Sequence, residues 1–536
     1  MATRLLQELI SKLPVEYQLL TKLDDSNITG IAFDSRNCKP GNLFFAIPGV
    51  HVDGNDFVPS LLHSDPGGII MSKLPDSQVI HQAQVKGIPL LYCSEIRPAL
   101  AWISKEWYDN PDDRLTLIGV TGTDGKSSTV WYIQQLLTEL GISSGFISTV
   151  AMQTGTTPGP NSLRQSTPEA PEIFHLLNTM VNQGKTHGVI EATSHGLSDR
   201  TSRLAALGFQ TAVFTNITHE HLEFHGTFDQ YLYDKANLFR KLTTKPSAGS
   251  DKPLAVINAQ SPYARYLAKA VGDQHQIHFY GIKDKIPTEN QDLPLTLWAT
   301  QVEDSTNGVT GSLHFFDPAD VPQTITVTLA IPGSFTLENI MAATLAVHNQ
   351  SIENHQPSLA EILRLVPKLQ GVKGRMRIIQ GNQPFSVIVD YAHTPGSFEK
   401  VFPLFRSITP GRLIALFGSG GERDQAKRPI QGKIAGTFAD VLILSNEDPR
   451  LEDPMEILNE IAQGVDNPQV EVVKIIDRYE AISFALQLAQ PGDTLVLLGK
   501  GHEQSIIIGN QKTPWDEETK VRTALIEAGY QLYDQN

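Results

Sequence analysis

The chain has 536 residues, of which 40% are hydrophobic and 19% are charged, and its formal net charge is −15. This length exceeds what a single hydrophobic core usually holds, so we expect roughly three globular domains of ~150 residues each. The acidic balance argues against a dedicated nucleic-acid binder and against binding to anionic membranes, because both need a basic surface.

The N-terminal stretch MATRLLQELISKLP is short, amphipathic and charged, so it predicts neither a signal peptide nor a membrane span. No apolar run elsewhere is long enough to cross a bilayer. Two cysteines, Cys38 and Cys93, are too few for a disulfide framework and fit a reducing cytoplasm. Up to about residue 110, short apolar runs alternate with turns and predict a small α/β domain. The segment YDNPDDR at 108–114 is a candidate linker.

The segment GVTGTDGKSSTVWYIQQLL at 119–137 combines a strand, a glycine-rich loop and a helix. Backbone N–H groups at such a turn and the helix dipole favour an anion, and Lys126 adds a full positive charge. A phosphate site is therefore predicted, with Ser127 as a ligand of Mg²⁺. The usual phosphate loop has four residues between its first glycine and its Gly-Lys pair, whereas Gly122 leaves two.

From residue 115 onward apolar strands such as HGVIEAT, TAVFTNIT and LAVIN alternate with helical patterns, which predicts a parallel sheet covered by helices. Two strand ends are rich in metal-ligating side chains. Each alone is typical of a solvated turn, but together beside the phosphate loop they favour a metal site. Oxygen ligands suit Mg²⁺, whereas mixed Glu and His ligands leave zinc open. The side chains concerned are Glu191, His195, His219, Glu220, His221, Glu223 and His225.

The next predicted elements are an antiparallel strand set, the helix SFTLENIMAATLAVHNQ and a further open sheet with strands FSVIVDYA, RLIALFGS, DVLILSNEDP and DTLVLLGKG. The expected fold is α/β with three domains, at 1–112, 113–370 and 371–536. Its central domain holds a phosphate-loop-type parallel sheet, and its C-terminal domain is Rossmann-like. In GSGGERDQAKRP, Arg423, Lys427 and Arg428 form either a carboxylate or phosphate site or a solvated loop. On spacing alone, Lys235 in YDKANLFRKL is a surface lysine.

Together these segments resemble the muramyl (Mur) ligase family, most closely its MurE type, over nearly the whole chain. FDSRNCKPGNLFFAIPGVHVDGNDF is similar to the UDP-binding domain of that type, GVTGTDGKSSTVWYI to its ATP loop, and STPEAPEIFHLL and EATSHGL to its substrate and metal segments. DYAHTPGSFEKVF, FGSGGERDQAKRP, EDPR and GKGHE resemble its C-terminal domain. The resemblance implies an ATP-dependent ligase that acts in peptidoglycan precursor synthesis.

In the reaction that the resemblance implies, ATP phosphorylates the terminal carboxylate of UDP-N-acetylmuramoyl-L-alanyl-D-glutamate. The amine of a third amino acid then attacks the acyl phosphate and phosphate leaves. The implied cofactors are ATP and Mg²⁺, and the implied partners are the UDP-linked dipeptide and a free diamino acid. Neither nucleic-acid binding nor membrane insertion is expected, and the expected oligomeric state is a monomer.

Site residues follow from the positions that match the family's motifs. Lys126, His221 and Lys235 are implied to be catalytic, with Lys235 carbamylated. For Lys235 the resemblance thus reverses the interpretation from spacing, which made it a surface lysine. Ser127, Glu191, His221 and Lys235 are implied metal ligands. The implied ATP contacts are Gly122, Thr123, Asp124, Gly125, Lys126, Ser127, Ser128, Asn339, Arg375 and Asp390. The implied dipeptide contacts are Ser35, Ser166, Thr167, Ser194 and Arg203, and Arg200 competes with Arg203 because SHGLSDRTSRL is two residues longer than the common segment.

The implied amino-acid contacts are Arg423, Asp448, Arg450, Gly499 and Glu503. Family members that add meso-diaminopimelate usually carry Asp-Asn-Pro-Arg, but here Asp448 replaces the asparagine while Arg450 is retained. An aspartate repels a carboxylate and attracts an ammonium group, so we expect L-lysine or L-ornithine rather than meso-diaminopimelate. Two alternatives stay open: a folylpolyglutamate-synthase-like ligase of the same superfamily, and a non-catalytic relative that binds the precursor.

Overall fold

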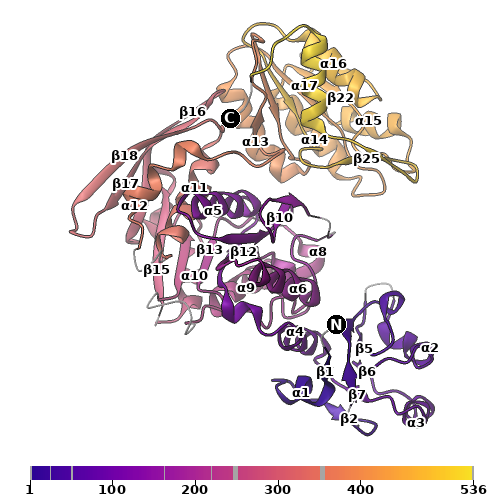
Figure 1. Cartoon of the computed structure of the whole chain (residues 1–536). Coiled ribbons are helices and arrows are strands. Elements are labelled where there is room, and N and C mark those ends of the chain that lie inside the picture. The colour runs from indigo at the N-terminus through magenta and orange to yellow at the C-terminus, as the bar shows by residue number, and fades with distance from the viewer. Residues whose placement is uncertain are drawn as a thin grey trace. The chain divides into compact units, whose positions relative to one another are not determined.

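The computed structural model describes residues 3–23, 26–49, 52–161, 163, 165–218, 220–244, 252–273, 275–350 and 356–533. The chain divides into two compact units. Figure 1 shows their helices and strands, coloured along the chain. The first comprises Met1–Gly281, Lys285–Leu297 and Met341–Ile362, and the second comprises Ile282–Asp284, Trp298–Ile340 and Leu363–Asn536. Among the described residues, no helix is long and apolar enough to cross a membrane.

The N-terminal part of the first unit contains a five-stranded sheet in the order β2-β7-β6-β5-β4, which confirms the predicted α/β character. Strands β4 to β7 are parallel, and β2 pairs antiparallel with β7. One apolar cluster includes side chains of α1 and α4, and a second includes side chains of α2 and α3. The elements are β1 (Arg4–Leu5), α1 (Leu6–Ser11), β2 (Gln18–Leu19), β3 (Asn27–Ile28), β4 (Gly30–Ala32), η1 (Ser35–Asn37), β5 (Asn42–Ala46), η2 (Gly54–Phe57), α2 (Val58–Leu61), β6 (Gly68–Met71), α3 (Ser77–Val85), β7 (Leu90–Tyr92) and α4 (Ile96–Trp107).

The candidate linker at 108–114 is not simply a solvated connection. Residues Pro111–Arg114 form a 3₁₀ turn (η3), and the Asp112 side chain is fully buried. Lys105 of α4 places its Nζ 2.8 Å from Asp112 Oδ2 and so compensates the buried charge. The polar sequence therefore reflects a local ion pair.

The central sheet contains the predicted parallel strands, in the order β11-β10-β9-β12-β8-β13-β14-β15, and β16, β17 and β18 follow in the same order. Strands β9, β12, β8, β13, β14 and β15 are parallel, whereas β10 and β11 are antiparallel. The strands are β8 (Thr116–Thr121), β9 (Ser144–Ile147), β10 (Ala151–Gln153), β11 (Gly159–Pro160), β12 (His187–Glu191), β13 (Thr211–Phe214), β14 (Leu254–Asn258) and β15 (Gln276–Ile282).

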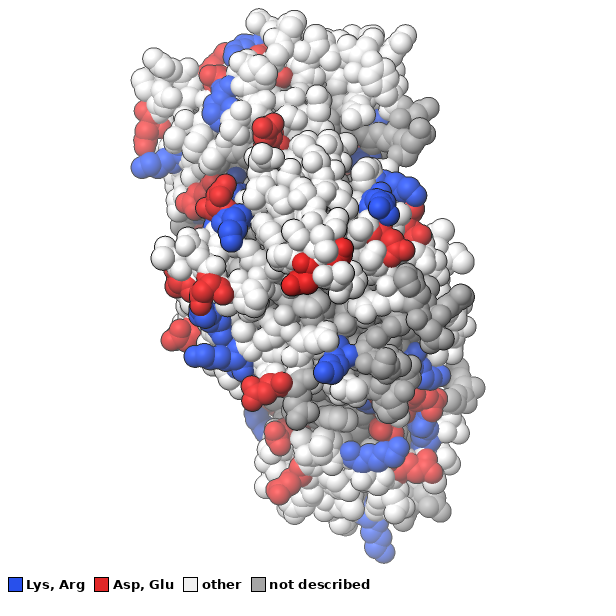
Figure 2. Space-filling view, turned by 90° about the vertical axis from the view of Figure 1, so that its left-hand side faces the viewer, with Lys and Arg blue, Asp and Glu red and all other residues white. Residues whose placement is uncertain are grey.

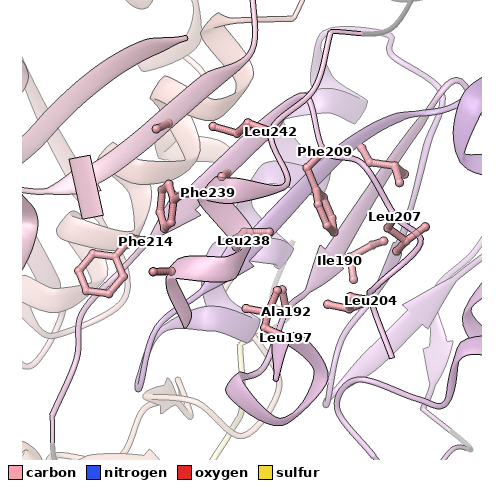
Figure 3. Packing of buried hydrophobic residues seen from close by; sticks show 14 of the residues in the cluster. Ile190, Ala192, Leu197, Leu204, Leu207, Phe209, Phe214, Leu238, Phe239 and Leu242 are labelled. Atoms are coloured by element: carbon pink, nitrogen blue, oxygen red, sulfur yellow. The ribbon is translucent and has the colours of Figure 1, made fainter. Parts of the chain in front are cut away.

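Helix α9 (Phe228–Arg240) packs closely on this sheet. Its Leu238 and Phe239 lie in an apolar cluster with Ala192, Leu197 and Phe214 (Figure 3). A Cβ on Gly119 of β8 would come within 2.5 Å of Leu238 Cδ1, so a larger residue would displace the Leu238 side chain from its present position. The close packing fixes the neighbouring Lys235 against the sheet. The other helices are α5 (Lys126–Glu139), α6 (Ala170–Asn182), α7 (Ser194–Leu197), α8 (Leu222–His225), α10 (Ala264–Val271), α11 (Ser334–His348) and α12 (Leu359–Leu363), with 3₁₀ turns η4 (Lys283–Lys285), η5 (Thr288–Asn290) and η6 (Val366–Lys368).

The second unit contains the predicted antiparallel strands and a six-stranded sheet in the order β19-β20-β24-β21-β22-β23. All strands of this sheet are parallel except β19. Its elements are β16 (Leu295–Ser305), β17 (Gly308–Phe316), β18 (Pro322–Leu329), β19 (Arg377–Ile378), β20 (Ser386–Val389), α13 (Pro395–Ile408), β21 (Leu413–Phe417), α14 (Lys427–Phe438), β22 (Val441–Leu444), α15 (Pro454–Gln463), β23 (Glu471–Lys474), α16 (Arg478–Leu488), β24 (Thr494–Leu497), β25 (Ser505–Ile508), β26 (Gln511–Pro514) and α17 (Glu517–Glu527).

Charged side chains on the face displayed in Figure 2 are interspersed, with acidic and basic groups next to one another. The view contains no broad basic patch of the kind that nucleic-acid binding requires.

Candidate functional site

The glycine-rich loop lies between the end of β8 and the start of α5, as predicted. Gly122 has a φ of +152°, and a Cβ at this position would lie 1.9 Å from Thr215 Oγ1. Gly125 has a φ of +81° immediately before α5. Both positions therefore require glycine. Lys126 is the first residue of α5, and its Nζ donates to the Thr123 carbonyl at 2.7 Å. Ser128 occupies the first turn of the same helix.

The segment after β13 holds this loop in place. Asn216 Oδ1 accepts from Asp124 N at 2.9 Å, and Asn216 Nδ2 donates to Asp124 O at 3.1 Å. Thr215 Oγ1 also donates to Asp124 O, at 2.6 Å, and Thr123 N donates to Asn216 O at 2.8 Å. The sequence interpretation did not single out Asn216. Its only signal was an Asn-containing strand end beside a predicted phosphate loop.

Glu191, at the end of β12, forms a buried polar cluster with Ser127. Its Oε2 accepts from Ser127 Oγ at 2.9 Å, from Ser148 Oγ at 2.8 Å and from Thr149 N at 2.9 Å. Its Oε1 accepts from Thr149 Oγ1 at 2.9 Å. These groups supply carboxylate and hydroxyl oxygens, which are the donor types that Mg²⁺ prefers. Ser127 and Glu191 thus fit the predicted ion chemically, and Ser148 and Thr149 are neighbours that the sequence did not reveal.

Lys235 is only 1% exposed, so the interpretation as a surface lysine is wrong. Its Nζ donates to the Gly122 carbonyl at 2.5 Å and lies 4.6 Å from the centre of the Tyr231 ring. Burial lowers the pKa of Lys235 well below its usual value, and the nearby charge of Lys126 lowers it further. The Tyr231 hydroxyl lies 3.0 Å from Thr123 Oγ1. Lys126 and Lys235 therefore both bind carbonyl groups of the same loop.

His221 is exposed at the start of α8, with a left-handed φ of +56°. Its Nδ1 lies 3.5 Å from Glu223 Oε1, its Nε2 lies 3.7 Å from Glu220 Oε2, and its ring centre lies 5.0 Å from that of His195. Within the described ranges, no group of three or more His, Cys, Asp or Glu side chains is arranged to hold a metal ion. His219 lies outside the described residues. The ligand role of His221 therefore stays a prediction.

Three of the residues predicted to hold the dipeptide lie around the start of α7. Thr167 Oγ1 donates to the Glu191 carbonyl at 2.8 Å, and Ser194 is the first residue of α7. Arg203 Nη1 donates to the Thr167 carbonyl at 2.9 Å. Arg200 instead donates to the Phe224 carbonyl, at 2.9 Å, so Arg203 is the arginine beside Thr167. Ser166 precedes Thr167 and is half-buried, whereas Ser35 begins η1 beside the N-terminal sheet.

In the second unit, Asp448, Gly499 and Glu503 lie around Lys500. The fully buried Lys500 Nζ lies 3.0 Å from Asp448 Oδ1 and 2.6 Å from Glu503 Oε2. Asp448 Oδ1 also accepts from Ile507 N at 2.9 Å. The charge of Asp448, on which the expected preference for lysine or ornithine depends, is thus partly compensated within the protein. Arg450 has a φ of +54°, and its backbone N–H bonds to the Ile507 carbonyl at 3.1 Å.

Glu447, the residue before Asp448, was not singled out from the sequence. It is 9% exposed, and its Oε2 is buried with no hydrogen-bond partner in the described structure. A Cβ on Gly499, which has a φ of +99°, would lie 2.8 Å from this oxygen. Burial raises the pKa of Glu447 to about 7, against the opposing effect of Lys427 and Lys500. The sequence signal was an acidic residue at the carboxyl end of a parallel strand.

The three basic residues of the segment GSGGERDQAKRP, Arg423, Lys427 and Arg428, have different environments. Arg428 is fully buried, with Nη1 2.9 Å from Glu452 Oε2 and 2.8 Å from Glu460 Oε2. It is therefore a structural cation that links the start of α14 to α15 and the loop before it. Arg423 is exposed in the loop after β21.

The remaining predicted ATP contacts, Asn339, Arg375 and Asp390, belong to the second unit. Asp390 accepts from Met376 N at 2.8 Å and from Ala392 N at 2.7 Å. The Arg375 guanidinium lies 4.6 Å from the centre of the Tyr391 ring, so Arg375 and Asp390 occupy one locality. Asn339 is a buried residue of α11.

Comparison with known proteins gives three family matches along the chain. The Mur ligase family catalytic domain matches residues 27–108, the Mur ligase middle domain residues 120–347, and the Mur ligase glutamate ligase domain residues 374–501.

Two curated relatives align over nearly their whole length. A UDP-N-acetylmuramyl-tripeptide synthetase of Roseiflexus sp. (strain RS-1) is 40% identical over 94% of this chain and 95% of the relative. A UDP-N-acetylmuramoyl-L-alanyl-D-glutamate–2,6-diaminopimelate ligase of Trichormus variabilis is 35% identical over 97% of this chain and 99% of the relative. A solved structure of a UDP-N-acetylmuramoyl-L-alanyl-D-glutamate–2,6-diaminopimelate ligase has a TM-score of 0.66 and 28% identity, and the match covers 98% of this chain and 100% of that one.

Proposed function

The chain belongs to the Mur ligase family and is an ATP-dependent ligase, and on this premise we propose that it adds the third amino acid to UDP-N-acetylmuramoyl-L-alanyl-D-glutamate. In this reaction a terminal carboxylate oxygen of the dipeptide attacks the γ-phosphorus of ATP, the bond from that phosphorus to the bridging oxygen of ADP breaks, and an acyl phosphate and ADP form. The amine of the third amino acid then attacks the carbonyl carbon, an amide bond forms and phosphate leaves.

The observation that carries this proposal is the convergence of groups on the loop between β8 and α5. Lys126 and Lys235 bind loop carbonyls, and Ser127 bonds to Glu191 beside them. A lysine and backbone N–H groups at this turn would neutralise charge that develops on the transferred phosphoryl group. Ser127 and Glu191 would hold Mg²⁺, which when bound supplies further positive charge to the phosphate oxygens.

We further propose that Lys235 is carbamylated, as the family resemblance implies. The modification would convert the buried amine, 2.5 Å from the Gly122 carbonyl, into a carboxylate-like group. Its test is ¹³C NMR of the protein equilibrated with ¹³C-bicarbonate. We expect a carbamate resonance that is absent from a Lys235→Ala variant, and a spectrum without this resonance in the active wild-type protein would contradict the modification.

For the third amino acid we propose L-lysine or L-ornithine. The buried Oε2 of Glu447 has no hydrogen-bond partner in the described structure, and a carboxylate here would repel the distal carboxylate that only meso-diaminopimelate carries. Asp448 and Glu503 share Lys500 and add negative charge to the same locality. The retained Arg450 is the feature that favours a distal carboxylate instead.

The direct experiment supplies the purified protein with ATP, Mg²⁺, the UDP-linked dipeptide and equal concentrations of lysine, ornithine and meso-diaminopimelate. We expect tripeptide product from lysine or ornithine ahead of diaminopimelate. A clear preference for diaminopimelate would overturn the assignment of the amino acid alone. If none of the three amino acids yields tripeptide and ATP hydrolysis does not depend on the dipeptide, the ligase proposal is overturned and a precursor-binding role is favoured. A monomeric state and a cytoplasmic location stay predictions.

A further inference from the structure

Three buried polar side chains are linked by hydrogen bonds, and two of them, His225 and Asp234, have no role in the proposed reaction. Asp234 Oδ2 lies 2.7 Å from His225 Nδ1, and His225 Nε2 lies 3.0 Å from Ser194 Oγ. The side chains of His225 and Asp234 are 0% and 1% exposed. The three residues come from α8, α9 and α7, so the hydrogen bonds connect three separate helices.

Two further side chains of helix α9 hydrogen-bond to Asp234 and to the end of α7. Gln230 Nε2 donates to Asp234 Oδ1 at 3.0 Å, one turn along the helix, and so occupies the second carboxylate oxygen. Asn237 Nδ2 donates to the carbonyl of Leu197, the last residue of α7, at 3.0 Å. The side chains of Leu197 and Leu238 belong to the same apolar cluster (Figure 3). The position of Ser194 relative to α9 is therefore defined by both packing and hydrogen bonds.

The chemistry of the three groups fixes the direction of each hydrogen bond. A carboxylate only accepts, so Asp234 requires Nδ1 of His225 to carry the proton. Nε2 of the neutral ring is then an acceptor, and the Ser194 hydroxyl must donate to it. Burial lowers the pKa of His225, which favours this neutral ring, although Asp234 acts in the opposite direction. Ser194 Oγ keeps its lone pairs and can accept a hydrogen bond.

We propose that His225 and Asp234 are positioning residues that orient the Ser194 hydroxyl as an acceptor for an N–H group of the UDP-linked dipeptide. This inference rests on the proposed function, because the substrate role of Ser194 comes from there. Ser194 is 2% exposed, so protein groups rather than solvent determine its hydroxyl orientation. Loss of either positioning residue would leave Ser194 in place with a wrongly directed hydroxyl.

The test is a double-mutant cycle on the full-length enzyme with Ser194→Ala, His225→Gln, Asp234→Asn and the Ser194→Ala/His225→Gln double variant. Each single variant should raise KM for the dipeptide by about tenfold, while KM for ATP and for the amino acid stays within about twofold of wild type. Because His225 acts through Ser194, the double variant should be no worse than Ser194→Ala. His175→Gln, an exposed histidine of α6, is the matched control and should behave as wild type.

Three results would overturn the inference. The first is a rise in dipeptide KM in the double variant that equals the product of the rises in Ser194→Ala and His225→Gln. The second is an equal rise in KM for all three substrates, and the third is loss of folding in both His225→Gln and the isosteric Asp234→Asn. Either of the last two would assign the pair a purely structural role. A wild-type protein without dipeptide-dependent ATP turnover would instead refute the proposed function.

Discussion

Lys126 lies at the start of α5 and bonds only to a loop carbonyl in the hydrogen bonds described for its side chain. Its side chain places a positive charge at the predicted phosphate site and does not belong to the hydrophobic core. Lys126→Ala should therefore lower kcat by about 100-fold or more, as removal of a group that stabilises transition-state charge does. Steady-state ligase assays measure the loss, and near-normal activity would refute the assignment. Lys433→Ala, at an exposed lysine of α14, is the control for loss of a positive charge.

The raised pKa of Glu447 leads to a prediction for the pH dependence of the proposed amino-acid site. Burial raises the pKa of this carboxyl from 4.5 to about 7, so its ionised fraction increases as the pH rises through neutrality. If its carboxylate binds the substrate ammonium, KM for the amino acid should fall between about pH 6 and pH 8. Glu447→Gln should abolish this step in the KM profile. A wild-type KM that is flat over this interval would contradict the role.

The raised pKa of Glu447 also makes the free energy of unfolding depend on pH: a rise in pH that favours substrate binding lowers stability. Between the unfolded value of 4.5 and the folded value of about 7, the native state binds more protons at Glu447 than the unfolded state does. Its contribution to the free energy of unfolding therefore falls as the pH rises through this window. Substrate binding at high pH would thus use a charge whose burial costs stability.

Two residues show why the sequence could not predict all side-chain environments. The helical spacing of α9 correctly predicts an amphipathic helix, but it placed Lys235 at the surface, whereas the residue is 1% exposed. The polar side of α9 is covered by the loop after β8, and that contact joins residues 113 positions apart. The sequence left Arg428 open between an anion site and a solvated loop, and its ion pairs could not be predicted because Glu452 and Glu460 come from outside its helix.

At the level of elements, the loop after β8 depends on the segment after β13. Asn216 bonds to both the N–H and the carbonyl of Asp124. Asn216→Ala removes both bonds and should raise KM for ATP by about tenfold, which corresponds to loss of roughly 1–2 kcal/mol of hydrogen bonding. KM for the amino acid should not change. Asn459→Ala, at an exposed residue of α15, is the control. An unaltered KM for ATP in Asn216→Ala would contradict the proposal that Asn216 holds the loop in place.

Helices α16 and α17 are joined by a buried ion pair. Arg478 Nε lies 3.0 Å from both carboxylate oxygens of Glu517, and the two residues are 2% and 1% exposed. Arg478→Met leaves the Glu517 charge buried without its partner, so the free energy of unfolding should fall by about 3–5 kcal/mol. Urea unfolding measures the change. In the same measurement Lys433→Met, which breaks an exposed 3.5 Å pair with Asp466, should cost less than about 1 kcal/mol.

Over the whole molecule, the pattern of apolar runs correctly predicted the α/β class, the parallel strands and the antiparallel strand set. These features depend on local periodicity, which a sequence displays directly. The ion pair between Asp112 and Lys105 could not be predicted from segment 108–114 alone, because Lys105 belongs to a helix outside that segment. The domain boundaries at 112 and 370 stay a prediction.

The proposed reaction also makes a prediction for the whole enzyme that isolated contacts cannot supply. A carboxylate that passes through an acyl phosphate must give one of its oxygens to the phosphate that leaves. A ligase that activated the carboxylate as an acyl adenylate would instead release pyrophosphate and transfer this oxygen to AMP. The fate of that oxygen therefore distinguishes the two classes of mechanism.

The most direct measurement uses UDP-N-acetylmuramoyl-L-alanyl-D-glutamate with ¹⁸O in the terminal carboxylate. The enzyme receives ATP, Mg²⁺ and lysine or ornithine, and mass spectrometry follows both the tripeptide and the released phosphate. We predict that each tripeptide formed is matched by one phosphate that carries a single ¹⁸O atom. Unlabelled phosphate, or phosphate released without tripeptide, would contradict the central claim.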